Sequence, residues 1–205
     1  MSSTTEDLTR PVETKGWRVV DIVVAAVLGV AVGLVFWAFN NTIASFWDPI
    51  DAVLPGLAGL IAGVWFLGGP LGGLIIRKPG AALLVETLAA TVSVLPGNKW
   101  GITTLYSGLA QGIGAEIVFA IFAWRRWNLP VAILSGIGAA LGAFTYEYLK
   151  GNHAYGLTYN ATYFICLVIS GAVLAGGLAH VLTKALASAG ALNRFESGNQ
   201  ARQAV

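Results

Sequence analysis

The sequence predicts an all-α integral membrane protein that crosses the bilayer with six helices. Hydrophobic residues make up 56% of the 205 residues and charged residues only 11%, a balance that water-soluble globular domains do not have. A helix needs roughly 20 apolar residues to cross a hydrocarbon core about 30 Å thick. Six segments approach this length: residues 19–39, 50–76, 79–95, 102–124, 130–149 and 158–186. We therefore expect one transmembrane domain, residues 19–186, between two tails, residues 1–18 and 187–205.

The first segment, residues 19–39, carries small residues at a spacing of four: Ala25, Gly29 and Gly33. Small residues at this spacing let two membrane helices approach closely. In a glycine-rich membrane protein the default interpretation is packing within the chain. Contact with a partner subunit is the alternative.

The second segment, residues 50–76, is too long for one straight crossing. It contains the sequence GGPLGG at residues 68–73, so we predict tilt, a kink or a broken helix near Pro70. A break within the membrane needs protein neighbours that satisfy the freed backbone groups.

The third segment, residues 79–95, contains Glu86 on the face that it shares with small residues, namely Ala82, Ala89, Ala90 and Ser93. We expect this face to point into the bundle. A carboxylate near the bilayer centre is costly, so it is retained for a pairing, a ligand or a proton. A carboxyl group that only fixes helix packing is the alternative.

The fourth segment, residues 102–124, divides into a small and polar face and an apolar face. Gln111 and Glu116 belong to the first face, which we expect to point inward. The second face, which we expect to meet lipid, contains Ile102, Tyr106, Leu109, Ile113 and Ile117. Gln111 both donates and accepts hydrogen bonds and suits the edge of a heterocycle, whereas Glu116 is either structural or coupling-related.

The fifth and sixth segments, residues 130–149 and 158–186, are joined by a connection rich in aromatic residues. On the same side of the membrane lie the other loops that follow the odd-numbered segments. Together with the helix ends they collect Trp37, Phe39, Phe46, Trp47, Trp100, Tyr146, Tyr148, Tyr155, Tyr159 and Tyr163, with Asp48, Asp51 and Glu147 among them. These rings either anchor the protein at the lipid headgroups or, beside carboxylates, hold a flat cationic ligand.

The basic residues predict that both termini are cytoplasmic. With six spans the termini share one side, and ten basic residues fall on that side: Arg10, Lys15, Arg18, Arg77, Lys78, Arg125, Arg126, Lys184, Arg194 and Arg202. Only Lys99 and Lys150 fall on the other side. Because cytoplasmic loops carry the excess of Lys and Arg, the aromatic side is the extracellular one.

Several classes of function lack their sequence signature. No G-x-x-x-x-G-K-[ST] motif occurs, so the chain is not itself an ATPase. The single cysteine, Cys166, excludes a disulfide framework and a cysteine-based metal site. No nucleophile stands with a base, so we expect no enzymatic activity. We also expect no nucleic-acid partner.

Two segments carry a resemblance to a known family. RKPGAALLVETLAA at residues 77–90 and GNKWGITTLYSGLAQGIGAEIVFAIF at residues 97–122 resemble the YkoE family of substrate-binding S components of energy-coupling factor (ECF) transporters. The resemblance extends over about residues 16–186 and implies a six-helix vitamin-binding subunit of the plasma membrane. It also implies a transmembrane coupling subunit and two cytoplasmic ATPases as partners, with thiamine or its hydroxymethylpyrimidine precursor as the ligand. In S components the first helix contacts the coupling subunit, and here Ala25, Gly29 and Gly33 are the matching positions.

Together, the residue patterns and the family resemblance predict a non-enzymatic binding subunit. It uses no cofactor of its own, because the partner ATPases consume the ATP. We expect Glu86 and Gln111 to hold the polar edge of the ligand and Trp100 and Tyr146 to stack on its rings. Further candidates at the outer helix ends are Glu147, Asn160 and Tyr163. The alternative is an autonomous ion-coupled transporter of a small amphipathic cation, in which Glu86 or Glu116 carries a proton.

Overall fold

The regular elements of the described residues are all helical. The computed structural model describes residues 16–193, 195, 197 and 198. In chain order the elements are α1 (Val19–Thr42), the 3₁₀ segment η1 (Ile43–Phe46), α2 (Trp47–Val53), the 3₁₀ segment η2 (Leu57–Phe66), α3 (Gly68–Ile76), α4 (Ala81–Val94), α5 (Thr103–Ile121), α6 (Leu129–Lys150), the 3₁₀ turn η3 (Asn152–Tyr155), α7 (Gly156–Ser170), the π-helical segment η4 (Gly171–Gly177) and α8 (Leu178–Ser188). The predicted all-α class is confirmed.

Five helical stretches of the described chain are long and apolar enough to cross a membrane. They are Val19–Thr42, Leu57–Ile76, Thr103–Ile121, Leu129–Lys150 and Asn152–Ser188. The third predicted span corresponds to α4, which has only 14 residues and extends about 21 Å. The structure thus shows five full-length candidates and one shorter apolar helix rather than six equal spans.

The second span begins later than predicted and is broken where predicted. Ile50 belongs to the short helix α2, and the chain turns at Gly56, where φ is 87°, before η2 begins. The helix type changes at Leu67, between η2 and α3, so Pro70 is the third residue of a new helix. Its missing N–H is not needed there, because the first N–H groups of a helix have no intrahelical acceptor.

A neighbouring helix satisfies backbone groups of the 3₁₀ segment η2. The Ser170 hydroxyl of α7 donates to the carbonyl oxygen of Leu60 (2.7 Å) and accepts from the amide of Gly63 (2.7 Å). This is the protein neighbour that irregular backbone at membrane depth requires.

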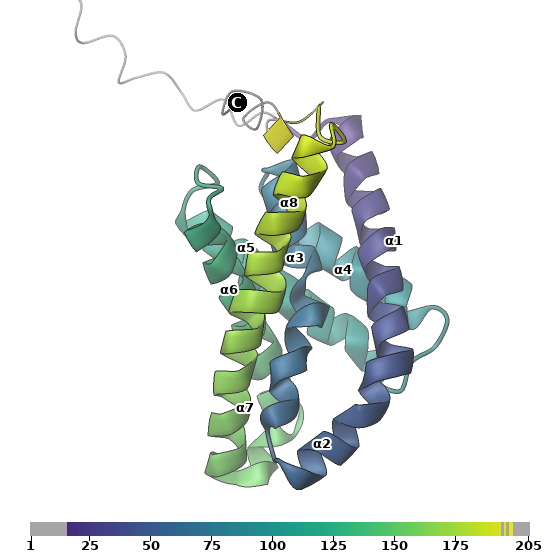
Figure 1. Ribbon diagram of the computed structural model, residues 1–205, viewed down its shortest axis with the longest axis vertical. Coiled ribbons are helices and arrows are strands. Elements are labelled where there is room, and N and C mark those ends of the chain that lie inside the picture. Colours follow the sequence, from purple (N-terminus) through teal and green to yellow (C-terminus); the bar gives the residue numbers. More distant parts are fainter. Residues whose placement is uncertain (1–15, 194, 196, 199–205) are drawn as a thin grey trace, which may run out of the picture.

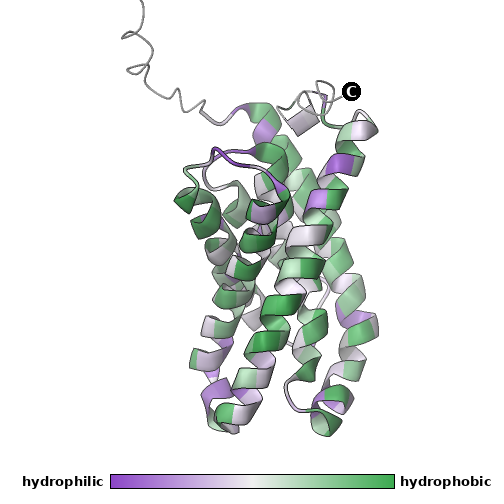
Figure 2. Ribbon diagram, turned by 60° about the vertical axis from the view of Figure 1, so that its left-hand side comes forward, coloured by the Kyte–Doolittle hydropathy of each residue, from purple (hydrophilic) through white to green (hydrophobic). Residues whose placement is uncertain are grey.

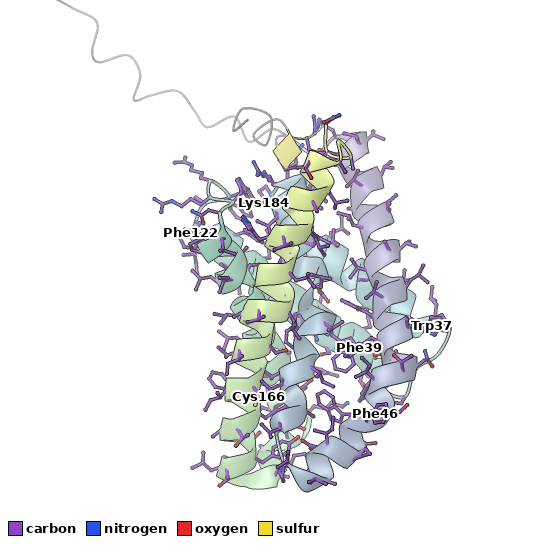
Figure 3. The ribbon with its side chains drawn as sticks, in the orientation of Figure 1. Trp37, Phe39, Phe46, Phe122, Cys166 and Lys184 are labelled. Carbon is purple, nitrogen blue, oxygen red and sulfur yellow. The ribbon has the colours of Figure 1, made fainter. Side chains whose placement is uncertain are left out.

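The helices run between two ends of an elongated bundle (Figure 1). We call the end that carries the start of α1 and the end of α8 the terminal end, and the end that carries α2 the α2 end. Apolar residues cover most of the length of the helices, and hydrophilic residues lie mainly toward the two ends (Figure 2). Among labelled side chains, Phe39 and Phe46 lie toward the α2 end, and Phe122 and Lys184 toward the terminal end (Figure 3).

Helix α1 packs on α4 through its small residues. Ala25 is fully buried, and a Cβ atom added to Gly29 or Gly33 would lie 2.5 Å from Leu88 Cβ or 2.6 Å from Val92 Cβ. A partner subunit could reach these three positions only if α1 left α4. The default interpretation for Ala25, Gly29 and Gly33, packing within the chain, is what the structure shows, and their contact with a partner subunit stays a prediction.

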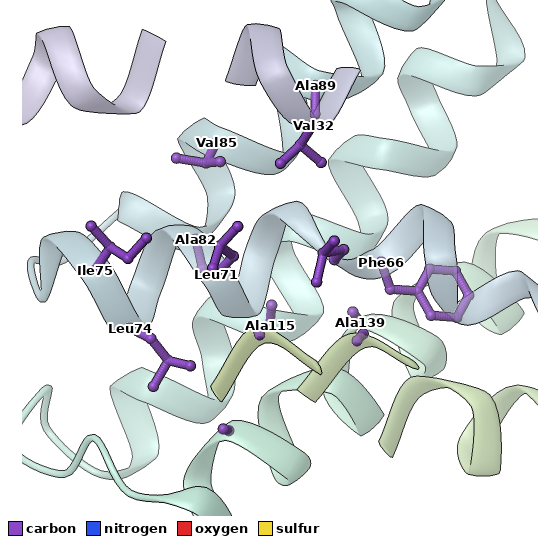
Figure 4. Packing of buried hydrophobic residues seen from close by; sticks show 14 of the residues in the cluster. Val32, Phe66, Leu71, Leu74, Ile75, Ala82, Val85, Ala89, Ala115 and Ala139 are labelled. Carbon is purple, nitrogen blue, oxygen red and sulfur yellow. The ribbon is translucent and has the colours of Figure 1, made fainter. Parts of the chain in front are cut away.

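The two predicted faces of α5 are confirmed. Ile102, Ile113 and Ile117 are exposed, as are Tyr106 and Leu109, whereas Gln111 and the small residues around it are buried. The buried face of α5 packs on α4 and α6. The central core lies where α1, α3, α4, α5 and α6 meet, and Val32, Leu71, Ala82, Ala89 and Ala115 are among its members (Figure 4).

An ionic cluster joins α1 to the connection between α3 and α4 at the terminal end. The fully buried Asp21 accepts hydrogen bonds from Lys78 and from Arg18 (2.9 Å). The predicted N-terminal tail lies mostly outside the described residues. In the predicted C-terminal tail the described Ser197 is buried and donates to the carbonyl oxygen of Ile75 (3.2 Å), so this part of the tail contacts the bundle.

Candidate functional site

A cavity of about 480 Å³ opens into the bundle from the α2 end. Residues of α1, α2, η2, α4, α5, α6 and α7 line it, so it lies among nearly all the helices. Its size suits a drug-sized or vitamin-sized molecule. Its polar and aromatic lining includes Asn40, Trp47, Asp48, Asp51, Trp65, Glu86, Trp100, Ser107, Gln111, Tyr146, Glu147, Lys150, Tyr159 and Tyr163.

Aromatic rings form one side of the cavity around Trp65, which lies near the end of η2. The Trp65 ring centroid is 5.3 Å from that of Trp100 and 5.6 Å from that of Trp47. Phe39 meets the same ring edge-on at 4.9 Å, and Tyr163 meets Trp47 at 6.3 Å. These edge-to-face and tilted contacts hold the rings at fixed angles, so flat surfaces are already in place for a flat ligand.

Glu86 lies in the deep wall of the cavity, and the broken second span holds its carboxylate. Glu86 Oε2 accepts a hydrogen bond from the backbone amide of Gly69 (2.7 Å), the second residue of α3. The N-terminus of a helix carries free N–H groups and a partial positive charge, which stabilise an anion. A side chain at Gly68 would place its Cβ 2.9 Å from Glu86 Oε2, so glycine at this position lets the backbone approach the carboxylate. The GGP sequence therefore supplies a backbone hydrogen-bond donor to the buried Glu86 side chain.

Gln111 links Glu86 to the aromatic wall. Its amide nitrogen donates to Glu86 Oε1 (3.2 Å) and to the carbonyl oxygen of Trp65 (2.9 Å), and its oxygen accepts from the Ser107 hydroxyl (2.8 Å). We assign this orientation because the opposite one would point the oxygen only at acceptors. Gln111 is the ninth residue of α5, about 12 Å along the helix from its first residue at the α2 end. The Glu86–Gln111 pair is thus the polar floor of a deep cavity.

Two further carboxylates lie nearer the mouth, each bonded to a tyrosine of α7. Asp51 accepts from the Tyr159 hydroxyl (3.0 Å) and the backbone amide of Gly56 (2.8 Å). Glu147 accepts from the Tyr163 hydroxyl (2.7 Å). The two tyrosine rings stack with centroids 5.8 Å apart. Among the described lining residues there are four carboxylates and only one ammonium group, that of Lys150, so the cavity favours a cation.

Six of the seven predicted binding residues line this cavity: Glu86, Trp100, Gln111, Tyr146, Glu147 and Tyr163. Asn160 is buried and does not line the cavity, so its contact with a ligand stays a prediction. Its amide nitrogen donates to the carbonyl oxygens of Asn152 and Gly156 (2.8 Å each) and so holds the α6–α7 connection. Proximity to an outer helix end had suggested a ligand contact, but the loop uses the amide nitrogen, and the Oδ1 atom has no hydrogen-bond partner among the described residues.

Glu116 has a structural role in this bundle. Its Oε1 accepts from the backbone amide of Gly80 (2.7 Å) and the indole N–H of Trp124 (2.8 Å), and its Oε2 accepts from the amide of Ala82 (3.0 Å). These groups belong to the start of α4 and to the terminal end of the bundle, and Glu116 does not line the cavity. Its carboxylate therefore caps α4.

Trp65, Asn40 and Ser107 are the site residues that sequence reasoning missed. Trp65 sits inside an apolar segment, where a ring is expected to be a core or lipid contact. Its position in the middle of a predicted span, away from the interfacial belt, was the available signal. Asn40 was missed because the polar sequence around it resembles a loop, although the residue belongs to the last turn of α1.

The fold and the cavity define a class, namely a multi-pass membrane subunit that binds a small molecule between its helices. Residues 20–142 match the family model described as "ABC-type cobalt transport system, permease component". The chain is 37% identical over 193 residues to YkoE of Bacillus subtilis (strain 168), which is named as an HMP/thiamine permease protein. That match covers 92% of this chain and 94% of the relative.

A solved structure described as the crystal structure of an S-component of ECF transporter superposes with a TM-score of 0.85. It is 34% identical, and the match covers 92% of this chain and 94% of the other. The chain therefore belongs to the YkoE family of ECF transporter S components. It is a substrate-binding subunit of the plasma membrane and not an enzyme. Among the described residues no group of three or more His, Cys, Asp or Glu side chains could hold a metal ion.

Proposed function

We propose that this S component captures thiamine or its hydroxymethylpyrimidine precursor at the extracellular side for ATP-driven uptake. The α2 end, where the cavity opens, faces outward in this proposal, and both termini are cytoplasmic. A transmembrane coupling subunit and two cytoplasmic ATPases supply the energy, and the chain itself binds no cofactor. The name of the Bacillus subtilis relative supports the choice of ligand.

The observation that carries the proposal is the Glu86–Gln111 pair at the floor of an aromatic cavity. An aminopyrimidine edge presents an exocyclic amino group, which donates hydrogen bonds, beside ring nitrogens, which accept them. Both N–H bonds of the Gln111 amide are already used by Glu86 and Trp65, but the Glu86 and Gln111 oxygens can still accept, so the pair suits the amino group of such an edge. The amide of Gly69 at the start of α3 bonds Glu86 Oε2, and Oε1 can still accept from a ligand.

The upper part of the cavity suits a ligand that also carries a positive charge. Trp47, Trp65 and Trp100 offer ring faces, and Asp51 and Glu147 offer negative charge. A cationic ring gains from both, through cation–π contact and charge pairing. The thiazolium of thiamine has this character, whereas hydroxymethylpyrimidine fills only the floor, so we expect thiamine to bind more tightly.

Family membership does not support the alternative of an autonomous ion-coupled transporter, and the contacts of Glu116 leave it no free oxygen for a proton relay. The two functions make different predictions for vesicles that contain only this chain. An ion-coupled carrier accumulates ligand in such vesicles when a proton gradient is applied. An S component binds the ligand but does not accumulate it without the ATPases.

The test of the proposal is a tryptophan-fluorescence titration of the purified chain with thiamine and with hydroxymethylpyrimidine. We expect a saturable change, because three indole rings line the cavity. The matched control is Tyr106→Phe, since Tyr106 is exposed on the opposite face of α5 and lies outside the cavity lining. It should titrate like the wild type. Absence of binding for both compounds in a folded sample would overturn the proposal.

A further inference from the structure

Asn40 is a cavity residue with one hydrogen-bonding group used and the other unused. It belongs to the last turn of α1, is 7% exposed and lines the cavity. Its Oδ1 accepts a hydrogen bond from the indole N–H of Trp65 (2.7 Å). Its Nδ2 has no hydrogen-bond partner in the described part of the chain.

The contact with Trp65 fixes which way the Asn40 amide points. An indole N–H only donates, so the group that faces it must be the carbonyl oxygen. The two N–H bonds of Nδ2 are consequently directed away from Trp65. A buried donor without a partner is unfavourable and is rare in folded proteins, so it calls for an explanation.

A continuous series of hydrogen bonds connects Asn40 to the floor of the cavity. Gln111 bonds both Glu86 Oε1 and the carbonyl oxygen of Trp65, and the indole N–H of the same tryptophan bonds Asn40. Trp65 therefore stands between an acceptor, Glu86, and an unused donor, Asn40. A ligand that satisfied both would carry a donor and an acceptor on one polar edge.

We propose that Asn40 is a specificity-determining residue whose Nδ2 donates a hydrogen bond to an unprotonated ring nitrogen of a heteroaromatic ligand. This inference rests on the proposed function and adds to it the group that reads the acceptor on the ligand. It predicts selection against rings of the same shape that lack the nitrogen, because their C–H would leave Nδ2 without a partner.

The next residue offers a matched contrast. Asn41 is exposed, its Nδ2 donates to the carbonyl oxygen of Trp37 (2.8 Å), and it does not line the cavity. An asparagine at this end of α1 is therefore not unsatisfied by default. Asn41→Leu changes the same chemistry one residue away without touching the cavity.

The experiment compares two dissociation constants for each protein. One is for thiamine or hydroxymethylpyrimidine, whichever binds more tightly, and the other is for its benzene counterpart, in which both ring nitrogens are replaced by C–H. We expect the wild type and Asn41→Leu to prefer the natural ring by about tenfold or more, the scale of one buried hydrogen bond. In Asn40→Leu, whose side chain has nearly the same shape, this preference should fall to about threefold or less.

A second variant separates recognition from positioning. Asn40→Asp keeps an oxygen that can accept from the indole N–H of Trp65 and removes the Nδ2 donor, so it should lose the preference for the natural ring as Asn40→Leu does. If Asn40 acted only by holding Trp65, Asn40→Asp would keep the preference, and the proposal would be overturned. Should Asn40→Leu not fold, as judged by gel filtration, Asn40→Ala is measured in its place.

The remaining outcomes are also decisive. An undiminished preference in Asn40→Leu, or no preference in the wild type, overturns the role of Asn40 while leaving the proposed function intact. A folded wild-type protein that binds neither natural compound overturns the proposed function, and the role of Asn40 with it.

Discussion

Glu86 and Glu116 are two carboxylates that the same bundle stabilises in the same way and uses differently. Each accepts a hydrogen bond from the start of a helix, Glu86 from Gly69 of α3 and Glu116 from Gly80 and Ala82 at α4. The difference lies in what else surrounds them. Both oxygens of Glu116 are occupied by backbone and indole N–H groups, whereas Glu86 Oε1 accepts from the side-chain amide of Gln111, and Glu86 lines the cavity.

This comparison shows that a helix N-terminus near an intramembrane carboxylate does not by itself define its role. The helix start makes the charge tolerable in both places. Function depends on whether an acceptor remains directed at a space that a ligand can enter. For Glu86 that space exists, and for Glu116 the backbone fills it.

The largest effect should come from removing an acceptor at the cavity floor. Glu86→Gln keeps the size of the side chain but replaces one acceptor oxygen with an amide nitrogen that donates, so we expect the affinity for thiamine to fall about tenfold or more, the value of one buried hydrogen bond. The measurement is the fluorescence titration, with gel filtration to verify folding. Unchanged affinity would remove Glu86 from the site and make it equivalent to Glu116.

The second effect concerns the charge of the ligand rather than of the protein. A phosphate ester of thiamine adds negative charge near a cavity lined by four carboxylates and one lysine, and like charges at a binding site oppose association. Competition with thiamine should show at least about tenfold weaker binding of the monophosphate ester. Equal affinity would show that Lys150 and the mouth of the cavity accept phosphate.

The third prediction is the converse of the first. Glu116→Gln removes the charge that caps α4, so the free energy of unfolding should fall by about 1–2 kcal/mol, which lowers Tm by a few degrees in a chain of this size. Thiamine affinity should stay within about twofold of the wild type. Thermal unfolding in detergent and the titration report the two quantities, and weakened binding with unchanged Tm would reverse the assignment.

Sequence reasoning found the helices and the inward faces because both depend on local periodicity. Glu86 and Gln111 were placed by the faces that they share with small residues, and the glycines around Pro70 predicted the break in the second span. What that break does could not be predicted, because it depends on which helix lies opposite α3. The same limit explains Asn160 and Trp65, since neighbours distant in the sequence decide whether a side chain reaches the cavity.

The smallest effect is expected at the exposed ion pair beside the mouth, where Lys99 bonds Asp48 (2.9 Å) and lies 4.9 Å from the centroid of the Trp100 ring. Both charges are solvated, the side chains of Lys99 and Asp48 being 38% and 78% exposed, and such pairs contribute little to stability.

Lys99→Ala leaves Asp48 unpaired near the path of a cationic ligand, so the association rate for thiamine should rise slightly and its affinity should improve by less than about threefold. Stopped-flow fluorescence at low and high salt measures this, because added salt should abolish the gain. A large loss of affinity instead would mean that this pair holds the mouth of the cavity in shape, and an exposed charge would then matter as much as the buried Glu86.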